Sequence, residues 1–138
     1  MGWIKSGERT LTTAEFDERA RRAATVIQGL GVESGDGIAL YLRNDIAYFE
    51  AAFGAGMLGI YPVPVNWHYT PDEANYLLTD SGVKLLLIHA DLYEPIKQAI
   101  PAGLQVIIVE TPPEIQEAYG IPKAPQPEGL PRWHDLLD

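Results

Sequence analysis

The stretch "IALYLRNDIAYFEAAFGAGMLGIYPVPV", residues 38–65, contains two apolar segments separated by a helical pattern. Residues 38–42 are continuously apolar, which is typical of a strand covered on both faces, as in a parallel sheet. Residues 60–65 predict a second strand, and its two prolines favour a position at the edge of the sheet. Between the strands, apolar side chains recur at helical spacing, at Ile46, Phe49, Phe53 and Met57. The stretch therefore predicts a strand–helix–strand unit.

The same alternation continues on both sides of this unit. Residues 3–11 predict a short hairpin, and Thr12 to Glu15 form a capping-box pattern that begins a helix. Thr70 to Glu73 form a second capping box, with a proline in the first helical turn. Beyond it, apolar runs at 84–89 and 104–109 predict two more strands.

A helix that starts at Asp91 is predicted between those two strands, with Pro95 still inside its tolerant first turn. Strand and helix thus alternate four times with short connections, which predicts an α/β fold with a mostly parallel sheet. We assign residues 1–110 to this α/β subdomain, including the short N-terminal hairpin. Residues 111–138 form a proline-rich tail with short helices, which either leads into further chain or packs back.

Composition excludes several classes of protein. The chain has 138 residues, of which 46% are hydrophobic and 21% charged, as in a single globular domain. Its net charge of −9 opposes binding to nucleic acid or to an anionic membrane. The absence of cysteine excludes disulfides and fits a reducing compartment, so we expect a cytoplasmic location. Residues 51–71 carry no formal charge, but glycines and prolines interrupt them, so we expect no membrane span.

Two apparent motifs for ligand chemistry are better explained by structure. Residues 54–59 match the GxGxxG pattern of dinucleotide-binding loops, but here the glycines close a helix and a strand follows, which is the reverse of the required order. Close helix packing and a turn explain them instead. His68, His89 and His134 are far apart and lack metal-ligand spacing, so we expect no metal site. A minor polar role remains open for His89, at the end of a strand.

Asn66, Trp67 and His68 lie between the second strand and the next predicted helix. Open α/β sheets bind ligands beyond the carboxyl ends of their strands, which is where these three residues fall. The neighbouring Thr70, Pro71 and Glu73 are explained by helix initiation alone. We therefore expect at most a supporting wall of a substrate site at Asn66, Trp67 and His68, and no catalytic, cofactor-binding or metal-binding residue in this chain.

Three features in this order resemble the N-terminal part of adenylate-forming (AMP-binding) enzymes, and most of all bacterial acyl-CoA synthetases. They are residues 11–16 with the helix that follows, the Gly35-Asp36 turn before a strand and Asn44, and "GAGMLGIYPVPVNW" (54–67) leading to "TPDE" (70–73). The resemblance extends from about Thr10 to His89. It implies ATP-dependent activation of a carboxylic acid, such as a fatty acid, as an acyl adenylate, followed by transfer to coenzyme A.

The resemblance also implies which parts are absent from these 138 residues. The family's Ser/Thr/Gly-rich phosphate loop, its aromatic-Thr-Glu stretch, its ribose-binding aspartate and its C-terminal lysine have no counterpart here. ATP, Mg²⁺ and coenzyme A belong to the parent family, and we expect none to be bound by this chain alone. We therefore expect an inactive N-terminal fragment of an acyl-CoA synthetase, whose natural partner is the downstream part of the same enzyme.

Two other hypotheses remain open. The chain could be a free-standing flavodoxin-like module that binds a small molecule at the carboxyl ends of its strands. It could also be an interaction remnant that forms a homodimer through an apolar face left bare.

Overall fold

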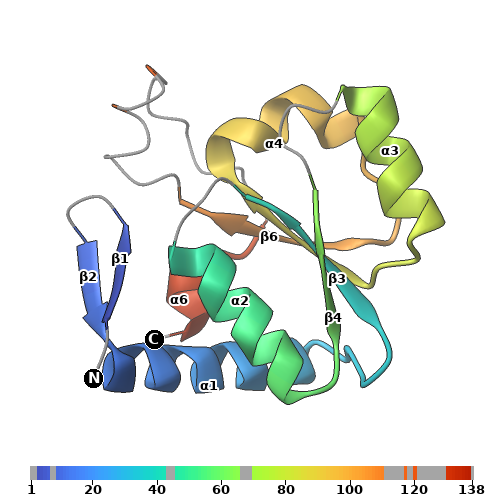
Figure 1. Cartoon of the computed structure of the whole chain (residues 1–138). Coiled ribbons are helices and arrows are strands. Elements are labelled where there is room, and N and C mark those ends of the chain that lie inside the picture. The colour runs from blue at the N-terminus through green and yellow to red at the C-terminus, as the bar shows by residue number, and fades with distance from the viewer. Residues whose placement is uncertain are drawn as a thin grey trace.

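The computed structural model describes residues 3–6, 9–42, 46–65, 70–110, 117, 120 and 130–137, with only the backbone at residues 3–11, 46 and 134. An antiparallel hairpin comes first, as predicted, and strands then alternate with helices (Figure 1). The elements are β1 (Trp3–Ser6), β2 (Arg9–Thr12), α1 (Thr13–Gly29), β3 (Gly37–Tyr41), α2 (Ile46–Met57), β4 (Tyr61–Pro64), α3 (Pro71–Asp80), β5 (Leu85–His89), α4 (Ala90–Ile96), the 3-10 turn η1 (Lys97–Ala99), β6 (Gln105–Val109) and α6 (Trp133–Leu137).

The main sheet has the order β4-β3-β5-β6, and every pair of neighbouring strands is parallel. The predicted α/β class is therefore confirmed. Leu40 of β3 lies opposite Leu87 of β5, and Leu87 lies opposite Ile107 of β6. All five residues of β5 are buried, which explains why its sequence is continuously apolar rather than alternating.

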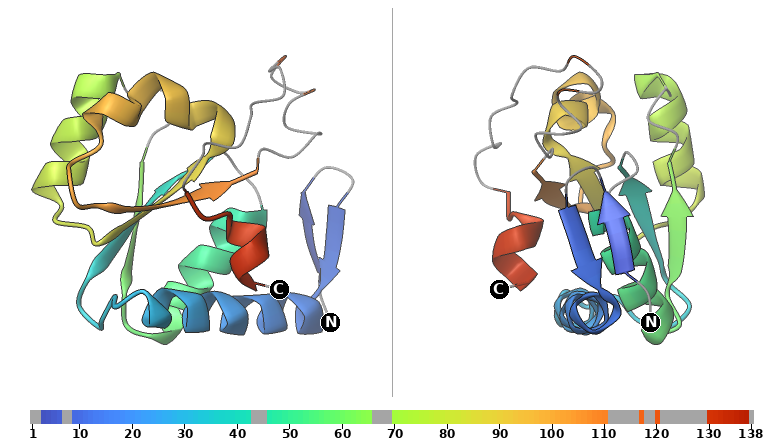
Figure 2. Two further views of the ribbon diagram at one scale, coloured as in Figure 1. Left: turned by 180° about the vertical axis from the view of Figure 1, so that it is seen from behind. Right: turned by 60° about the vertical axis from the view of Figure 1, so that its left-hand side comes forward.

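Helices cover both faces of this sheet (Figure 2). Side chains from α1, α2 and α6 pack on one face, in a cluster with Ile38, Leu40 and Leu85. Side chains from α3 and α4 pack on the other face, in a second cluster with Ala39, Leu86 and Ile88. Neighbouring residues of a strand point to opposite faces, so each central strand contributes to both clusters.

β4 lies at the edge of the sheet, as its prolines predicted. The backbone N–H of Tyr61 donates to the carbonyl of Asp36, just before β3, at 2.9 Å, and that of Val65 donates to the carbonyl of Leu40 in β3 at 3.0 Å. Because this direction alternates along a strand, the nitrogen atoms of Pro62 and Pro64 face away from β3. The two prolines therefore remove no hydrogen bond from the sheet, and they leave the outer edge without N–H donors at these positions.

Capping boxes begin α1 and α3, as predicted. The Thr12 hydroxyl accepts from the Glu15 N–H at 3.1 Å, and the Glu15 carboxylate accepts from the Thr12 N–H at 2.9 Å. Thr70 and Glu73 repeat the arrangement at 3.3 and 3.0 Å. Each box satisfies two N–H groups that the helix itself leaves without partners.

The prediction for α4 was wrong in one respect. The helix begins at Ala90, so Pro95 is its sixth residue and lies beyond the first turn. Proline has no N–H to donate to the carbonyl four residues earlier, and its ring crowds the preceding turn. The α-helix accordingly ends one residue later, at Ile96, and continues as the 3-10 turn η1.

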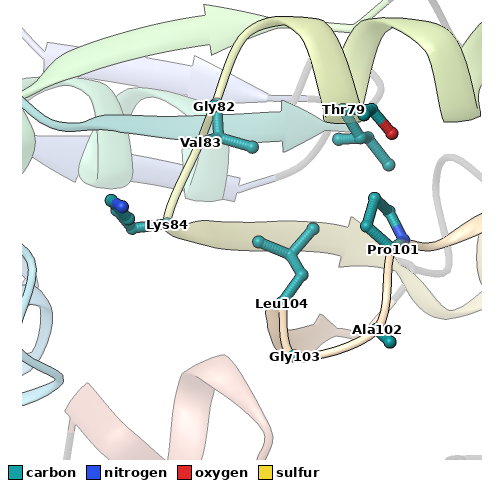
Figure 3. Close-up of a pocket in the computed structure, with 9 residues that line it drawn as sticks. Thr79, Gly82, Val83, Lys84, Pro101, Ala102, Gly103 and Leu104 are labelled. Carbon is teal, nitrogen blue, oxygen red and sulfur yellow. The ribbon is translucent and has the colours of Figure 1, made fainter.

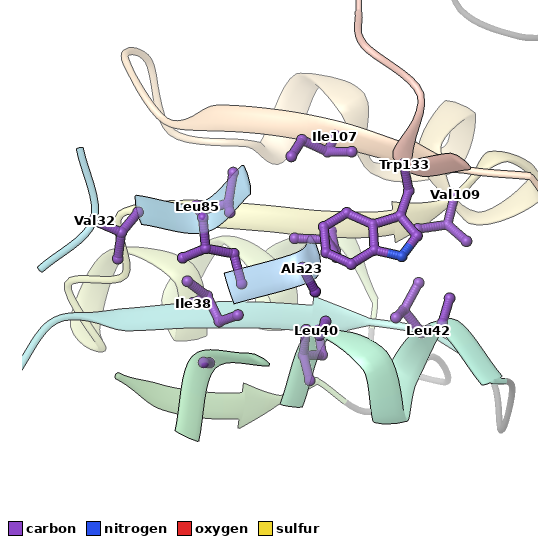
Figure 4. Close-up of a cluster of buried hydrophobic side chains, with 14 of the residues drawn as sticks. Ala23, Val32, Ile38, Leu40, Leu42, Leu85, Ile107, Val109 and Trp133 are labelled. Carbon is purple, nitrogen blue, oxygen red and sulfur yellow. The ribbon is translucent and has the colours of Figure 1, made fainter. Parts of the chain in front are cut away.

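The last described segment packs back onto the sheet. The Ile108 N–H of β6 donates to the Pro131 carbonyl at 2.9 Å, and Ile108 and Arg132 form an isolated parallel bridge. α6 then packs against β6 and α1, and Trp133 is completely buried in the cluster on the α1 and α2 side. Figure 4 shows its indole ring within the cluster that includes Leu42 and Val109.

Candidate functional site

The order of the strands defines one reversal point in the sheet. From β3 the chain crosses by α2 to β4 on one side, whereas from β5 it crosses by α4 to β6 on the other side. The two crossover helices pack on opposite faces. Open α/β sheets bind ligands at such a reversal, outside the carboxyl ends of the strands. The candidate position is therefore the end of β3 and β5, at Tyr41 and His89.

Tyr41 is nearly inaccessible, with 2% of its surface exposed. Burial raises the pKa of its phenol, and the negative charge of Glu73 at the start of α3 raises it further. The hydrogen bonds from Thr70 to the Glu73 carboxylate lower the pKa of Glu73, so this charge is present at neutral pH. The end of β3 therefore carries a buried, neutral phenol that lies within electrostatic range of the Glu73 carboxylate.

His89 is completely buried at the end of β5 and is already engaged in an interaction inside the protein. It precedes α4 but makes no side-chain hydrogen bond to cap that helix. The imidazole ring of His89 lies in the core and is not exposed to solvent. The minor polar role considered for His89 thus finds no exposed imidazole to support it.

The predicted wall residues Asn66, Trp67 and His68 fall outside the described residues. The same holds for Asn44, which contributes to the family resemblance, and for the side chain of His134. On either side of the predicted wall, Val65 is buried at the end of β4 and Thr70 caps α3. The role of this segment stays a prediction.

Two hollows in the described surface lie at the opposite end of the sheet. One, of about 340 Å³, lies between the turn before β5 and the turn before β6, with Lys84 and Leu104 among its lining residues (Figure 3). The other, of about 310 Å³, lies between the turn before β3 and the end of α2, with Glu33 and Leu58 among its lining residues. Both are at the amino ends of strands, where this type of sheet does not bind its ligands. We therefore assign neither to a nucleotide or an acyl group.

The glycines of the GxGxxG match serve packing and a turn. A Cβ atom at Gly54 would lie 2.9 Å from the Ala20 carbonyl oxygen of α1, so glycine lets the two helices approach closely. Gly59 lies in the turn that leads into β4. Its φ is 72°, a backbone conformation that favours glycine. The structural explanation of this motif is confirmed. Among the described residues, no group of three or more His, Asp or Glu side chains could hold a metal ion.

Glu50 is a buried carboxylate that the sequence did not reveal. Only 1% of its surface is exposed, on the inner side of α2. It accepts hydrogen bonds from Arg19 Nε of α1 and from Trp133 Nε1 of α6, the latter at 3.1 Å. A charge buried without partners would be strongly destabilising, and here both oxygens have a donor. The arrangement holds three helices together, and it leaves no carboxylate oxygen free for chemistry.

Comparison with known proteins identifies the class of this parallel-sheet domain. The AMP-binding enzyme family matches residues 3–136. A fatty acid–[acyl-carrier-protein] ligase of Streptomyces coeruleorubidus is 31% identical over 128 residues, which are 93% of this chain and 24% of that protein. A long-chain-fatty-acid–CoA ligase of Escherichia coli is 32% identical over 121 residues, or 86% of this chain and 21% of that protein.

Solved structures agree with this assignment. A benzoate CoA ligase from Burkholderia xenovorans is 28% identical with a TM-score of 0.78, over 96% of this chain and 24% of that one. A coronafacic acid ligase from Pectobacterium brasiliense has a TM-score of 0.81 at 15% identity, over 99% of this chain and 26% of that one, which supports the fold alone.

The chain belongs to the AMP-binding enzyme family, so the resemblance seen in the sequence is confirmed. It spans 16–24% of the length of the fatty-acid ligases that it matches. Within the described residues, no helix is both long and apolar enough to cross a membrane.

Proposed function

We propose that this chain is the N-terminal α/β part of an ATP-dependent acyl-CoA synthetase. The whole enzyme would activate a carboxylic acid as its acyl adenylate, release pyrophosphate and transfer the acyl group to coenzyme A. One observation carries the proposal: the family match extends over residues 3–136, yet the chain spans only 16–24% of the length of the fatty-acid ligases it resembles.

The residues of this chain do not fit the cofactors of such a reaction. Charge that develops on pyrophosphate needs several donors and a divalent cation close together. The sequence contains no Ser/Thr/Gly-rich loop ending in lysine, and the described residues contain no cluster of metal ligands. ATP, Mg²⁺ and coenzyme A would therefore bind to other parts of the whole enzyme. The role of this chain is to support the fold, with Asn66 to His68 as a wall of the acid site.

The acid belongs to a broad class. Relatives include ligases named for fatty acids, a feruloyl-CoA synthase and a benzoate CoA ligase. These substrates share a carboxylate on an apolar or aromatic body. We propose a fatty acid for the whole enzyme on the strength of the fatty-acid ligases among the matches, and a cytoplasmic location because the chain lacks cysteine.

An activity assay tests the proposal. The purified chain is incubated with ATP, Mg²⁺, coenzyme A and fatty acids of several lengths, and acyl-CoA and pyrophosphate are measured. The Escherichia coli ligase in parallel shows that the assay works. We expect neither product from this chain, and acyl-CoA formation would overturn the claim that it is inactive alone.

A binding measurement separates this proposal from the free-standing binding module. Thermal unfolding is followed with ATP, AMP, coenzyme A or fatty acid added in turn. A ligand present at 100 times its Kd stabilises the folded state by about 2.7 kcal/mol, so a functional module would show a clear shift of Tm. The proposal expects no shift, and a saturable shift with any of these ligands would favour the module.

A further inference from the structure

The two edges of the main sheet differ in how they resist pairing with another strand. At β4, Pro62 and Pro64 leave the outer edge without N–H donors. β6 forms the other edge of the described sheet, and its residues 105–109 ("QVIIV") contain no proline, glycine or charge. Four of these five residues are β-branched, and such strands pair readily with a strand of another molecule. The sequence of β6 therefore does not protect its own edge.

The backbone of β6 presents every second residue to this outer edge. The Ile108 N–H donates to the Pro131 carbonyl at 2.9 Å, on the side away from β5. Because the direction alternates along a strand, Val106 faces the same outer side, whereas Ile107 and Val109 face β5. In the described part of the chain, the isolated bridge formed by Ile108 is the one pairing on this side of β6.

Residues 130–137, which we call the edge strap, pass over this edge and contact both faces of the sheet. Leu130 packs against the cluster beside α3 and α4. Trp133 and Leu137 are buried in the cluster beside α1 and α2. Between these contacts, Pro131 lies along the edge itself and accepts the hydrogen bond from β6. The edge strap therefore covers β6 at the point where it crosses from one face to the other.

The residues of α6 hold the edge strap in place. One backbone hydrogen bond contributes little net free energy, and it does not offset the entropy of ordering the whole segment. Trp133 is completely buried, and its Nε1–H donates to Glu50 at 3.1 Å. At the other end of α6, Arg22 of α1 donates to the Leu137 carbonyl at 3.1 Å. Release of α6 would therefore also release Pro131 from the edge of β6.

We propose that the edge strap is a cover that closes β6 to strand addition, and that burial of Trp133 keeps this cover in place. While α6 is docked, the outward N–H of Ile108 is already bonded. When α6 is released, residues 105–109 become a bare apolar edge that can pair with a further strand. In a purified sample, the strands available are those of other copies of the chain. This inference does not depend on the proposed function, because it rests only on contacts within this chain.

Amide hydrogen exchange, measured for single residues by NMR, tests whether α6 controls this edge. Exchange at Ile108 requires only release of the edge strap, whereas exchange at Ile107 and Val109 requires wider opening of the sheet, because these two residues face β5. Trp133→Ala destabilises the docked strap, so it should accelerate exchange at Ile108 at least about tenfold. Leu137→Ala, at the other end of α6, should have the same effect to a smaller extent, and it serves as the test if Trp133→Ala does not fold.

Leu78→Ala is the matched control for loss of stability. Leu78 is a buried residue of α3 on the other face of the sheet, so its truncation destabilises the fold while the contacts of α6 remain. It should accelerate exchange at Ile107 and leave exchange at Ile108 almost unchanged. The proposal is overturned if Trp133→Ala accelerates exchange at Ile108 no more than Leu78→Ala does.

Aggregation of the purified chain tests what the released edge does. Trp133→Ala should form aggregates that bind thioflavin T faster than Leu78→Ala does. Addition of Val106→Pro to Trp133→Ala should slow this aggregation at least about fivefold, because it removes an outward N–H as Pro62 and Pro64 do at β4. Equal aggregation of the two single variants, or no effect of Val106→Pro, would contradict the role of the edge strap as a cover.

Discussion

Truncation of Trp133 is the most direct test of how the C-terminal segment is held. The indole is completely buried between α1, α2 and the sheet, and its Nε1–H donates to Glu50 at 3.1 Å. Replacement of a buried Trp by Ala costs about 3–5 kcal/mol. Domains of this kind are stable by only about 5–15 kcal/mol, so Trp133→Ala should remove a large share of the total.

Urea denaturation followed by far-UV circular dichroism measures this loss, since the signal does not depend on tryptophan fluorescence. With a slope of about 2 kcal/mol per M, a loss of about 4 kcal/mol lowers the midpoint by about 2 M. Trp133→Phe keeps much of the apolar contact but removes the donor to Glu50, and we expect an intermediate loss of about 1–3 kcal/mol. Tyr76→Ala, at a 71% exposed position, should change stability by less than about 0.5 kcal/mol.

The reasoning fails if Trp133→Ala lowers the midpoint no more than Tyr76→Ala does. That result would mean that α6 is not docked in solution. A full loss in Trp133→Phe, equal to that of Trp133→Ala, would instead assign the stabilisation to the hydrogen bond with Glu50 rather than to burial of the ring.

Three further predictions concern the helices. Gly54→Ala should destabilise the chain by about 1–3 kcal/mol in urea denaturation, because its Cβ would lie 2.9 Å from the Ala20 carbonyl oxygen; an unchanged midpoint would contradict the close packing of α1 and α2. Thr70→Ala should cost about 1 kcal/mol by the same assay, because the N-terminus of α3 loses its cap, and a neutral result would contradict the capping role. Hydrogen bonds from Thr70 lower the pKa of the folded-state Glu73 carboxyl below its ordinary value of 4.5. The ionised Glu73 side chain therefore contributes fully to stability above pH 4.5, and this contribution is lost as the pH falls through the lower pKa of the folded state. In a series of urea denaturations at decreasing pH, Glu73→Gln should therefore lose less stability below about pH 5 than the unchanged protein does. An unchanged dependence of the midpoint on pH would contradict the stabilising role of the ionised Glu73 side chain.

The parts of the fold that were predicted correctly are those decided by neighbours in sequence. Thr12 and Glu15 form a capping box because both partners lie within one helical turn. Pro62 and Pro64 place β4 at the edge because a missing N–H is a property of the residue itself. Pro95 was misplaced within α4 because the prediction depended on the first residue of a helix, and boundaries are the least certain part of a sequence pattern.

The features that were missed depend on partners far away in sequence. Glu50 looks like an ordinary polar residue of α2, and only Arg19, 31 positions away, and Trp133, 83 positions away, explain its burial. No local pattern distinguishes it from a solvent-exposed glutamate. For the candidate site, the order of elements in the sequence correctly indicated that the glycine motif at 54–59 is not a nucleotide-binding loop. The wall role of Asn66 to His68 stays a prediction, because these residues lie outside the described part of the chain.

The return of α6 to the start of the chain has a consequence for the order of folding. Arg22 of α1 donates to the Leu137 carbonyl at 3.1 Å, across 115 positions of sequence. On the ribosome, the α1 and α2 side of the sheet therefore stays uncovered at this position until Trp133 itself has emerged. We expect contacts of such long range to form late, because closing a longer loop of chain costs more entropy. Weakening them should accelerate unfolding and leave the rate of refolding almost unchanged.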